Sequence, residues 1–151
     1  MFADIQEKAS ELSFALRGGY ADVSEAIAWA DFIIEYSDQI NDEIFNITLC
    51  KSASDAIGHL NKISTNSNKW NVLRLFLHRF KDVRSMSISQ ASKLALHIRT
   101  NWEPDGNTPD DMQCIFDYWL LMDLAKDRVL GDDPNTVLQN FLDDIRAIAN
   151  F

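Results

Sequence analysis

Two pairs of carboxylates stand one helical turn apart in this chain of 151 residues, Asp31 with Glu35 and Asp123 with Asp127. Paired carboxylates serve general acid–base chemistry when burial shifts a pKa, and four-helix bundles use them as metal ligands together with Glu-x-x-His motifs. The chain contains no Glu-x-x-His. The two pairs therefore do not identify a catalytic or dimetal site.

Three histidines, His59, His78 and His97, are the other residues with ligand or acid–base chemistry. No two of them share a helical turn, so their spacing predicts no zinc site. Asp55 and Asp82 each lie four residues from a histidine, which predicts local pairs on a helix surface. The chain also lacks the glycine-rich phosphate loop, the nucleophile elbow and the zinc-protease motif. We expect no catalytic residues, no metal and no cofactor.

The composition is that of an ordinary globular domain, with 46% apolar and 25% charged residues. We expect a single domain over residues 1–151. The N-terminus has no signal-peptide pattern, and the apolar run at residues 118–122 is far shorter than the roughly 20 residues of a membrane span. These features predict a soluble, cytoplasmic chain that does not enter a membrane, with Cys50 and Cys114 as buried free thiols.

The net charge of −9 is unevenly distributed, because residues 69–99 carry seven basic residues and one acid. Phosphate affinity depends on clustered basic charge, so the acidic total disfavours a general nucleic-acid binder. We expect the basic segment to neutralise acidic neighbours within the fold. An acidic protein suits a basic partner, although acidity also serves solubility, and charge alone does not decide between the two.

Apolar residues recur at steps of three and four along the chain, which predicts an all-α fold, a bundle of six to seven mostly antiparallel helices. Residues 40–50 fit either a short helix or an extended connection, and we favour the helix. Helix ends are marked by glycine, by capping residues and by proline. Helices are expected to end at Gly18-Gly19 and at Gly131. Helix starts are expected at Asp22 with Glu25, Ser52 with Asp55, Ser87 with Gln90, Thr108-Pro109 and Asp133-Pro134. The helix that begins at Thr108-Pro109 is expected to be long and to reach about Leu130.

The helix that follows Asp22 is apolar on two faces. Its core stripe is predicted to contain Val23, Ile27, Ala30 and Ile34, with Ala26 and Ile33 beside it. Trp29, Phe32 and Tyr36 cluster on the far side, flanked by Glu25, and Asp31 and Glu35 line the edge between the faces. Such a helix is either central in the bundle or presents one face to a partner or a second copy, and the oligomeric state stays open.

The stretch at residues 17–34, RGGYADVSEAIAWADFII, resembles the opening of small bacterial immunity proteins, in which a glycine-containing turn precedes a helix bearing Trp-Ala-Asp. Such proteins accompany polymorphic and contact-dependent growth-inhibition toxins. The matching residues are Gly18, Gly19, Glu25, Ile27, Trp29, Ala30 and Asp31.

This resemblance implies a protein that is not an enzyme and that binds and neutralises a cognate toxin C-terminal domain with a basic surface, often a nuclease. Two groups of partner-binding residues are expected. The first is on the second helix, with Glu25, Trp29, Asp31, Phe32 and Glu35, and the second is in the acidic loop and the following helix, with Glu103, Asp105, Asp110 and Asp111. A helical scaffold or regulatory module with an endogenous partner, or a small metal- or carboxylate-dependent enzyme, remain the alternatives.

Overall fold

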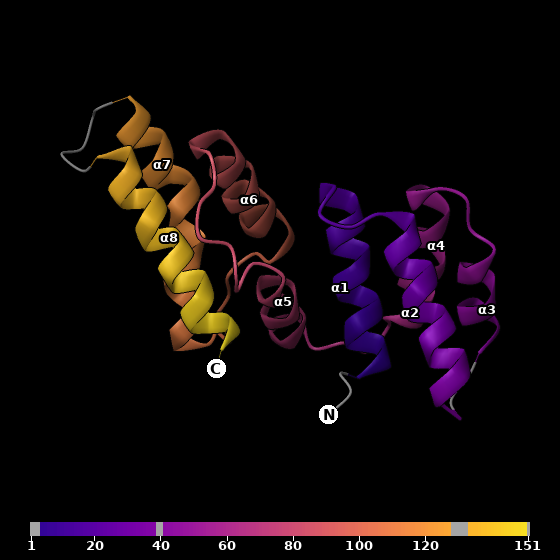
Figure 1. The fold of residues 1–151 in the computed structure, drawn as a ribbon. Helices are drawn as coiled ribbons and strands as arrows, with labels where there is room; N and C mark the ends of the chain where they lie inside the picture. The colour runs from indigo at the N-terminus through magenta and orange to yellow at the C-terminus, as the bar shows by residue number, and fades with distance from the viewer. Residues whose placement is uncertain (1–3, 39–40, 128–132, 151) are drawn as a thin grey trace. The chain divides into compact units, whose positions relative to one another are not determined.

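The computed structural model describes residues 4–38, 41–127 and 133–150. All regular structure in these ranges is helical, as predicted, and it comprises eight α-helices and one 3₁₀ helix (Figure 1). The expected count of six to seven is too low. The helix favoured at residues 40–50 is confirmed as residues 42–48, where the Asn41 side chain accepts a hydrogen bond from the Ile44 amide and caps the helix.

The chain divides into two compact units, residues 1–72 and 73–151, which we describe separately. The expectation of a single domain stays a prediction. Among the described helices, none is long and apolar enough to cross a membrane.

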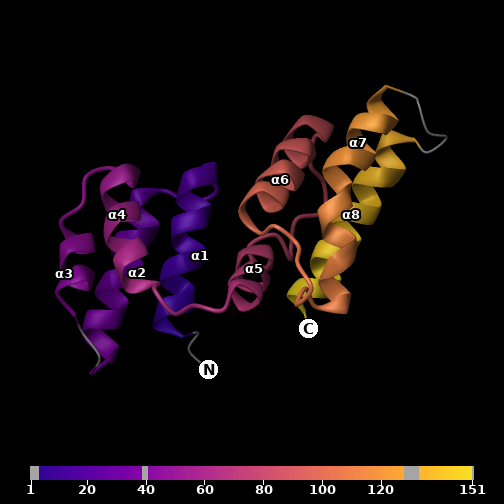
Figure 2. The same cartoon turned by 180° about the vertical axis from the view of Figure 1, so that it is seen from behind.

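Unit 1 contains α1 (Ile5–Gly18), α2 (Val23–Tyr36), α3 (Asp42–Thr48) and α4 (Ala53–Ile63) (Figure 2). Helix α1 packs along α4, and α3 packs against both α2 and α4. The core between them is made of small and aliphatic side chains, among them Leu12, Ile44 and Leu60, which are fully buried. The aliphatic face of each helix therefore sets its orientation in this unit.

Polar contacts fix α1 against α4 in unit 1. The Ser13 hydroxyl donates a hydrogen bond of 2.7 Å to the Asn61 side-chain oxygen, which also accepts one of 3.2 Å from Arg17. The fully buried Glu11 carboxylate lies 3.2 Å from the Lys8 ammonium on the same helix. A buried carboxylate without a cation would be strongly destabilising, so Lys8 contributes to keeping Glu11 in the core.

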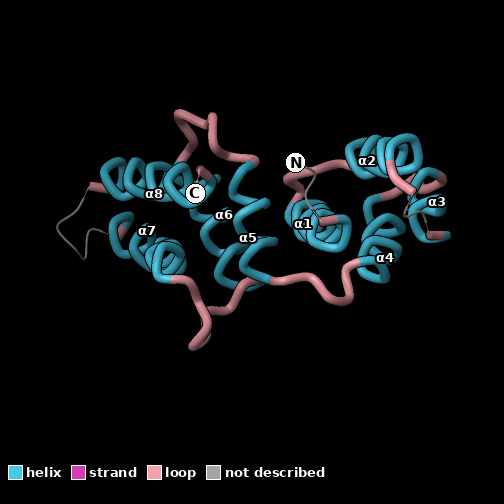
Figure 3. Tube along the Cα trace, turned by 90° about the horizontal axis from the view of Figure 1, so that it is seen from below, coloured by secondary structure: helices cyan, strands magenta, loops and turns pink. Residues whose placement is uncertain are grey.

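Unit 2 contains most of α5 (Lys69–His78), then α6 (Ile88–Asn101), the 3₁₀ helix η1 (Asp110–Asp117), α7 (Tyr118–Lys126) and α8 (Pro134–Ala149) (Figure 3). Helix α7 packs between α6 and α8, and η1 contacts both of these helices. Large side chains fill the interior, including Phe76, Trp102 and Phe141. The Phe76 ring lies 5.1 Å from Trp102, a distance at which aromatic rings interact favourably.

The prediction of one long helix from Thr108 to Leu130 is wrong for the first part of that range. Residues 110–117 form a 3₁₀ helix, and α7 begins only at Tyr118. Thr108 does not cap a helix. Its buried hydroxyl closes the preceding loop, accepting from the Asp105 amide at 2.8 Å and donating to the Asp105 carbonyl at 2.9 Å. The predicted end at Leu130 and Gly131 lies outside the described residues.

Candidate functional site, the surface of α2 and α3

Helix α2 is positioned by the turn that precedes it. Gly19 ends α1 with φ of 77°, a left-handed conformation that glycine adopts without steric cost. Asp22 then caps α2, because its carboxylate accepts a hydrogen bond of 3.1 Å from the Glu25 amide. Hydrogen bonds from the Ser24 hydroxyl and from this amide lower the pKa of Asp22. The predicted turn and cap are confirmed.

The buried face of α2 consists of Ala26, Ala30 and Ile33. Of the other residues that the sequence placed in the core stripe, Val23 and Ile34 are only partly buried against the core, and Ile27 is half-buried. The buried face is therefore rotated toward Trp29.

Trp29 departs from its predicted position on the far side of α2. It is partly buried and packs against the core of unit 1, since its large indole reaches the interior from the edge of the helix. Phe32 and Tyr36 do lie on the outer face, with 38% and 65% of their surface exposed. Their rings are 4.9 Å apart, so they form one apolar feature on the helix surface.

The three acids of α2 are all exposed. Within the described ranges, neither Asp31 nor Glu35 forms an ion pair, so their charges are open to solvent. Glu25 lies in the first turn of α2, where the positive end of the helix dipole favours an acid. Of the first predicted group, Glu25, Asp31, Phe32 and Glu35 therefore sit on the outside of α2, while Trp29 turns inward.

Helix α3 and its C-cap residue add two exposed apolar side chains that the sequence patterns did not indicate. Phe45 and Leu49 are exposed by 48% and 76%, and α3 packs directly against α2. A sequence signal for this region does exist. Residues 18–50 contain seven acids and no lysine, arginine or histidine. We call the outer residues of these helices the α2–α3 surface: Glu25, Asp31, Phe32, Glu35, Tyr36, Phe45 and Leu49.

The second predicted group lies in unit 2 and is largely engaged in local structure. The Asp111 carboxylate pairs with Arg74 of α5 at 3.2 Å, with both side chains about a third exposed or less. Asp105 accepts a hydrogen bond of 2.7 Å from the Asn107 amide within its own loop. Asp110 and Glu103 are exposed at the two ends of this segment. The Arg74–Asp111 pair agrees with the expectation that basic residues of the 69–99 segment neutralise acids in the fold.

The histidines stand on α4, α5 and α6, as predicted, but the predicted partner of His59 is wrong. His59 pairs with Glu43 of α3 rather than with Asp55. This contact, together with Lys62, lowers the pKa of Glu43. His97 is half-buried against the rings of Phe76 and Trp102. In the part of the chain that the structure describes, no three His, Cys, Asp or Glu side chains gather into a group that could hold a metal ion.

Both cysteines are free thiols, but they are less buried than expected. Cys50 is half-buried in unit 1, and Cys114 is exposed in unit 2. Local desolvation, with Asp144 as the second cause, raises the pKa of Cys114 to about 11. Such a thiol is mostly protonated at neutral pH, which does not suit a nucleophile.

Comparison with known proteins adds no family to these observations: no family model matches the chain, and neither the curated proteins nor the solved structures contain a match.

Proposed function

We propose that this chain is an immunity protein, which binds a cognate toxin domain in the cytoplasm through the α2–α3 surface and neutralises it. The observation that carries the proposal is the combination, in one segment without basic residues, of exposed large apolar side chains and exposed acids. The resemblance of residues 17–34 to the opening of small immunity proteins supports the same reading.

Protein interfaces combine an apolar centre with a polar, charged rim. Aromatic side chains such as Phe32 and Tyr36 supply rigid contact area at the centre of an interface. Acids around them attract a basic partner, which speeds association and disfavours acidic competitors. A nuclease domain needs a basic site because its substrate is anionic, so an acidic inhibitor competes for the same electrostatic field.

The direct test is calorimetric titration of the chain with the toxin C-terminal domain encoded by the gene immediately upstream, at two salt concentrations. We expect one-to-one binding that weakens as salt rises, because exposed charges are screened over about 8–10 Å near physiological salt. A toxin domain that is not bound, or the absence of such a domain upstream, would refute the proposal. Capture of an endogenous partner without any protection from a toxin would favour a scaffold or regulatory module.

Alanine variants test whether the toxin domain binds at the α2–α3 surface. Replacing Glu25, Asp31 and Glu35 together by alanine should slow association and reduce the salt dependence. The matched control replaces Asp82, Asp117 and Asp127, three exposed acids of unit 2, and changes the net charge by the same amount. Equal effects of the two triple variants would mean that total charge acts rather than this surface. Sedimentation of the free chain identifies any dimer that covers the surface.

A further inference from the structure

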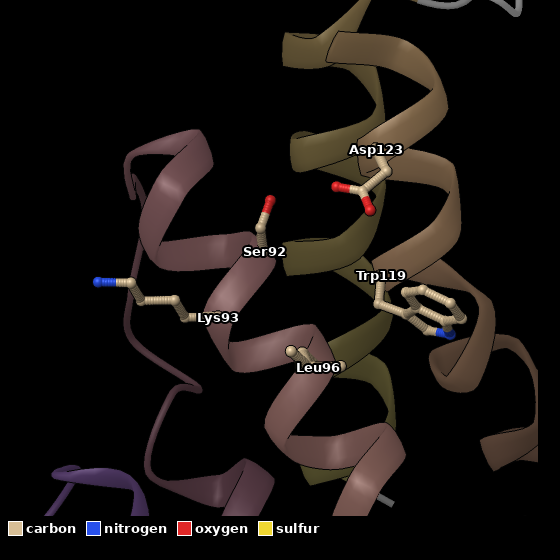
Figure 4. A pocket seen from close by; sticks show the side chains of 5 residues that line it. All are labelled: Ser92, Lys93, Leu96, Trp119 and Asp123. Carbon is tan, nitrogen blue, oxygen red and sulfur yellow. The ribbon is translucent and has the colours of Figure 1, made fainter. Parts of the chain in front are cut away.

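A groove of about 160 Å³ lies within unit 2 between α6 and α7. It is lined by Ser92, Lys93 and Leu96 from α6 and by Trp119 and Asp123 from α7 (Figure 4). Asp123 belongs to one of the two carboxylate pairs spaced by one helical turn, and it has no role in the proposed function.

The groove combines an apolar wall with one carboxylate. Leu96 is 52% exposed and Trp119 is half-buried, so both present hydrocarbon or aromatic surface to an occupant. The Ser92 hydroxyl donates a hydrogen bond of 3.7 Å to the Met122 sulfur, and this contact links α6 to α7. Figure 4 shows the Asp123 carboxylate pointing toward α6, on the groove side of α7.

The charge of Asp123 has no counterpart in the surroundings that the structure describes. No ion pair or side-chain hydrogen bond joins it to another described residue. It lies in the last turn of α7, where the negative end of the helix dipole disfavours an acid. The neighbouring Lys93 does not compensate it, since its side chain extends away from α7 in Figure 4.

We propose that this groove binds an arginine side chain of a protein partner. The planar guanidinium stacks on an indole and donates two parallel hydrogen bonds to a carboxylate, which a lysine ammonium does less well. Trp119 and Asp123 are four residues apart on α7 and both line the groove, so an occupant of the groove contacts both residues. The aliphatic stem of arginine lies against Leu96. This inference does not depend on the α2–α3 surface or on the proposed function.

The test is an NMR titration of the full chain with N-acetyl-arginine amide, read at the Trp119 indole N–H. We expect a saturable shift with a millimolar Kd. In Asp123→Asn the affinity should fall by about two- to fivefold, the value of an exposed ion pair. In Trp119→Leu, read at the Leu96 and Asp123 amides, it should fall by a similar factor of about two to five. Asp127→Asn is the matched control and should leave the affinity unchanged.

Three results would overturn the inference. They are the absence of a saturable shift, equal binding by wild type and Asp123→Asn, and equal binding of N-acetyl-leucine amide. The last result would identify an apolar pocket without charge selection. N-acetyl-lysine amide distinguishes the two cations, because it should bind more weakly than the arginine derivative if the planar fork is what the site recognises.

Discussion

Arg74 should contribute more to the stability of unit 2 than the acid that it pairs with. Its guanidinium Nη1 lies 3.2 Å from the Asp111 carboxylate and 2.7 Å from the Ile148 carbonyl, in the last turn of α8. The ion pair is partly exposed, so it is worth about 0.5–1 kcal/mol. The hydrogen bond from a charged donor to a helix-end carbonyl is worth about 1.5–3 kcal/mol.

These magnitudes predict an asymmetry between two variants. Asp111→Asn, which removes the charge and keeps the shape, should lower the opening free energy of α8 by about 0.5–1 kcal/mol. Arg74→Met removes both contacts and should lower it by about 2–4 kcal/mol. Hydrogen exchange of α8 amides measures this quantity for unit 2 alone, and the exchange rates should rise about two- to fivefold in the first variant and about 30- to 850-fold in the second.

Equal rates in the two single variants would refute this account, because the carbonyl contact would then contribute nothing. The double variant provides the control. Its loss should fall short of the sum of the two single losses by the energy of the ion pair, about 0.5–1 kcal/mol. High salt should reduce this coupling and leave the carbonyl contribution in place.

Other features of the two units yield three further predictions. Gly19→Ala should destabilise unit 1 by about 1–2 kcal/mol, because the φ of 77° is a left-handed conformation that alanine adopts only with strain. Gly58 lies within α4 and is open to solvent, so Gly58→Ala should stabilise unit 1 by up to about 1 kcal/mol. Urea unfolding measures both changes. Burial and the hydrogen bond to Asp144 raise the pKa of Tyr118, so this neutral phenol stabilises the fold below pH of about 10 and the stability is lost as pH rises further. Tyr118→Phe should flatten that alkaline decline in thermal melts, and an unchanged slope would contradict the assignment. Cys114, whose pKa rises from 9.0 to about 11, should react with iodoacetamide at pH 8 about 100-fold more slowly than a free thiol, as peptide mapping would show.

Local chemistry made the helix boundaries predictable from the sequence. Ser52 caps α4, Ser87 with Gln90 forms a full capping box at α6, and Asp133 with Pro134 opens α8. Each of these signals acts over three or four residues, so it needs no knowledge of the tertiary fold. The outward position of Phe32 followed in the same way from helical periodicity.

Features that depend on tertiary packing were not predictable. Trp29 packs against the core of unit 1, and a helical wheel contains no information on neighbouring helices. His59 pairs with Glu43 across two helices, in preference to the acid one turn away. Local propensity likewise did not indicate that residues 110–117 form a 3₁₀ helix before α7 begins at Tyr118.

The absence of basic residues from positions 18–50 has a consequence for covalent chemistry. Trypsin cuts after lysine and arginine, so the whole α2–α3 surface is carried on one tryptic peptide between Arg17 and Lys51. Amine-directed crosslinkers find no lysine there, and neither acetylation nor ubiquitination of lysine can alter its charge. Carboxyl-directed footprinting reads this segment instead, with seven acids as reporters along α2, α3 and their flanking turns.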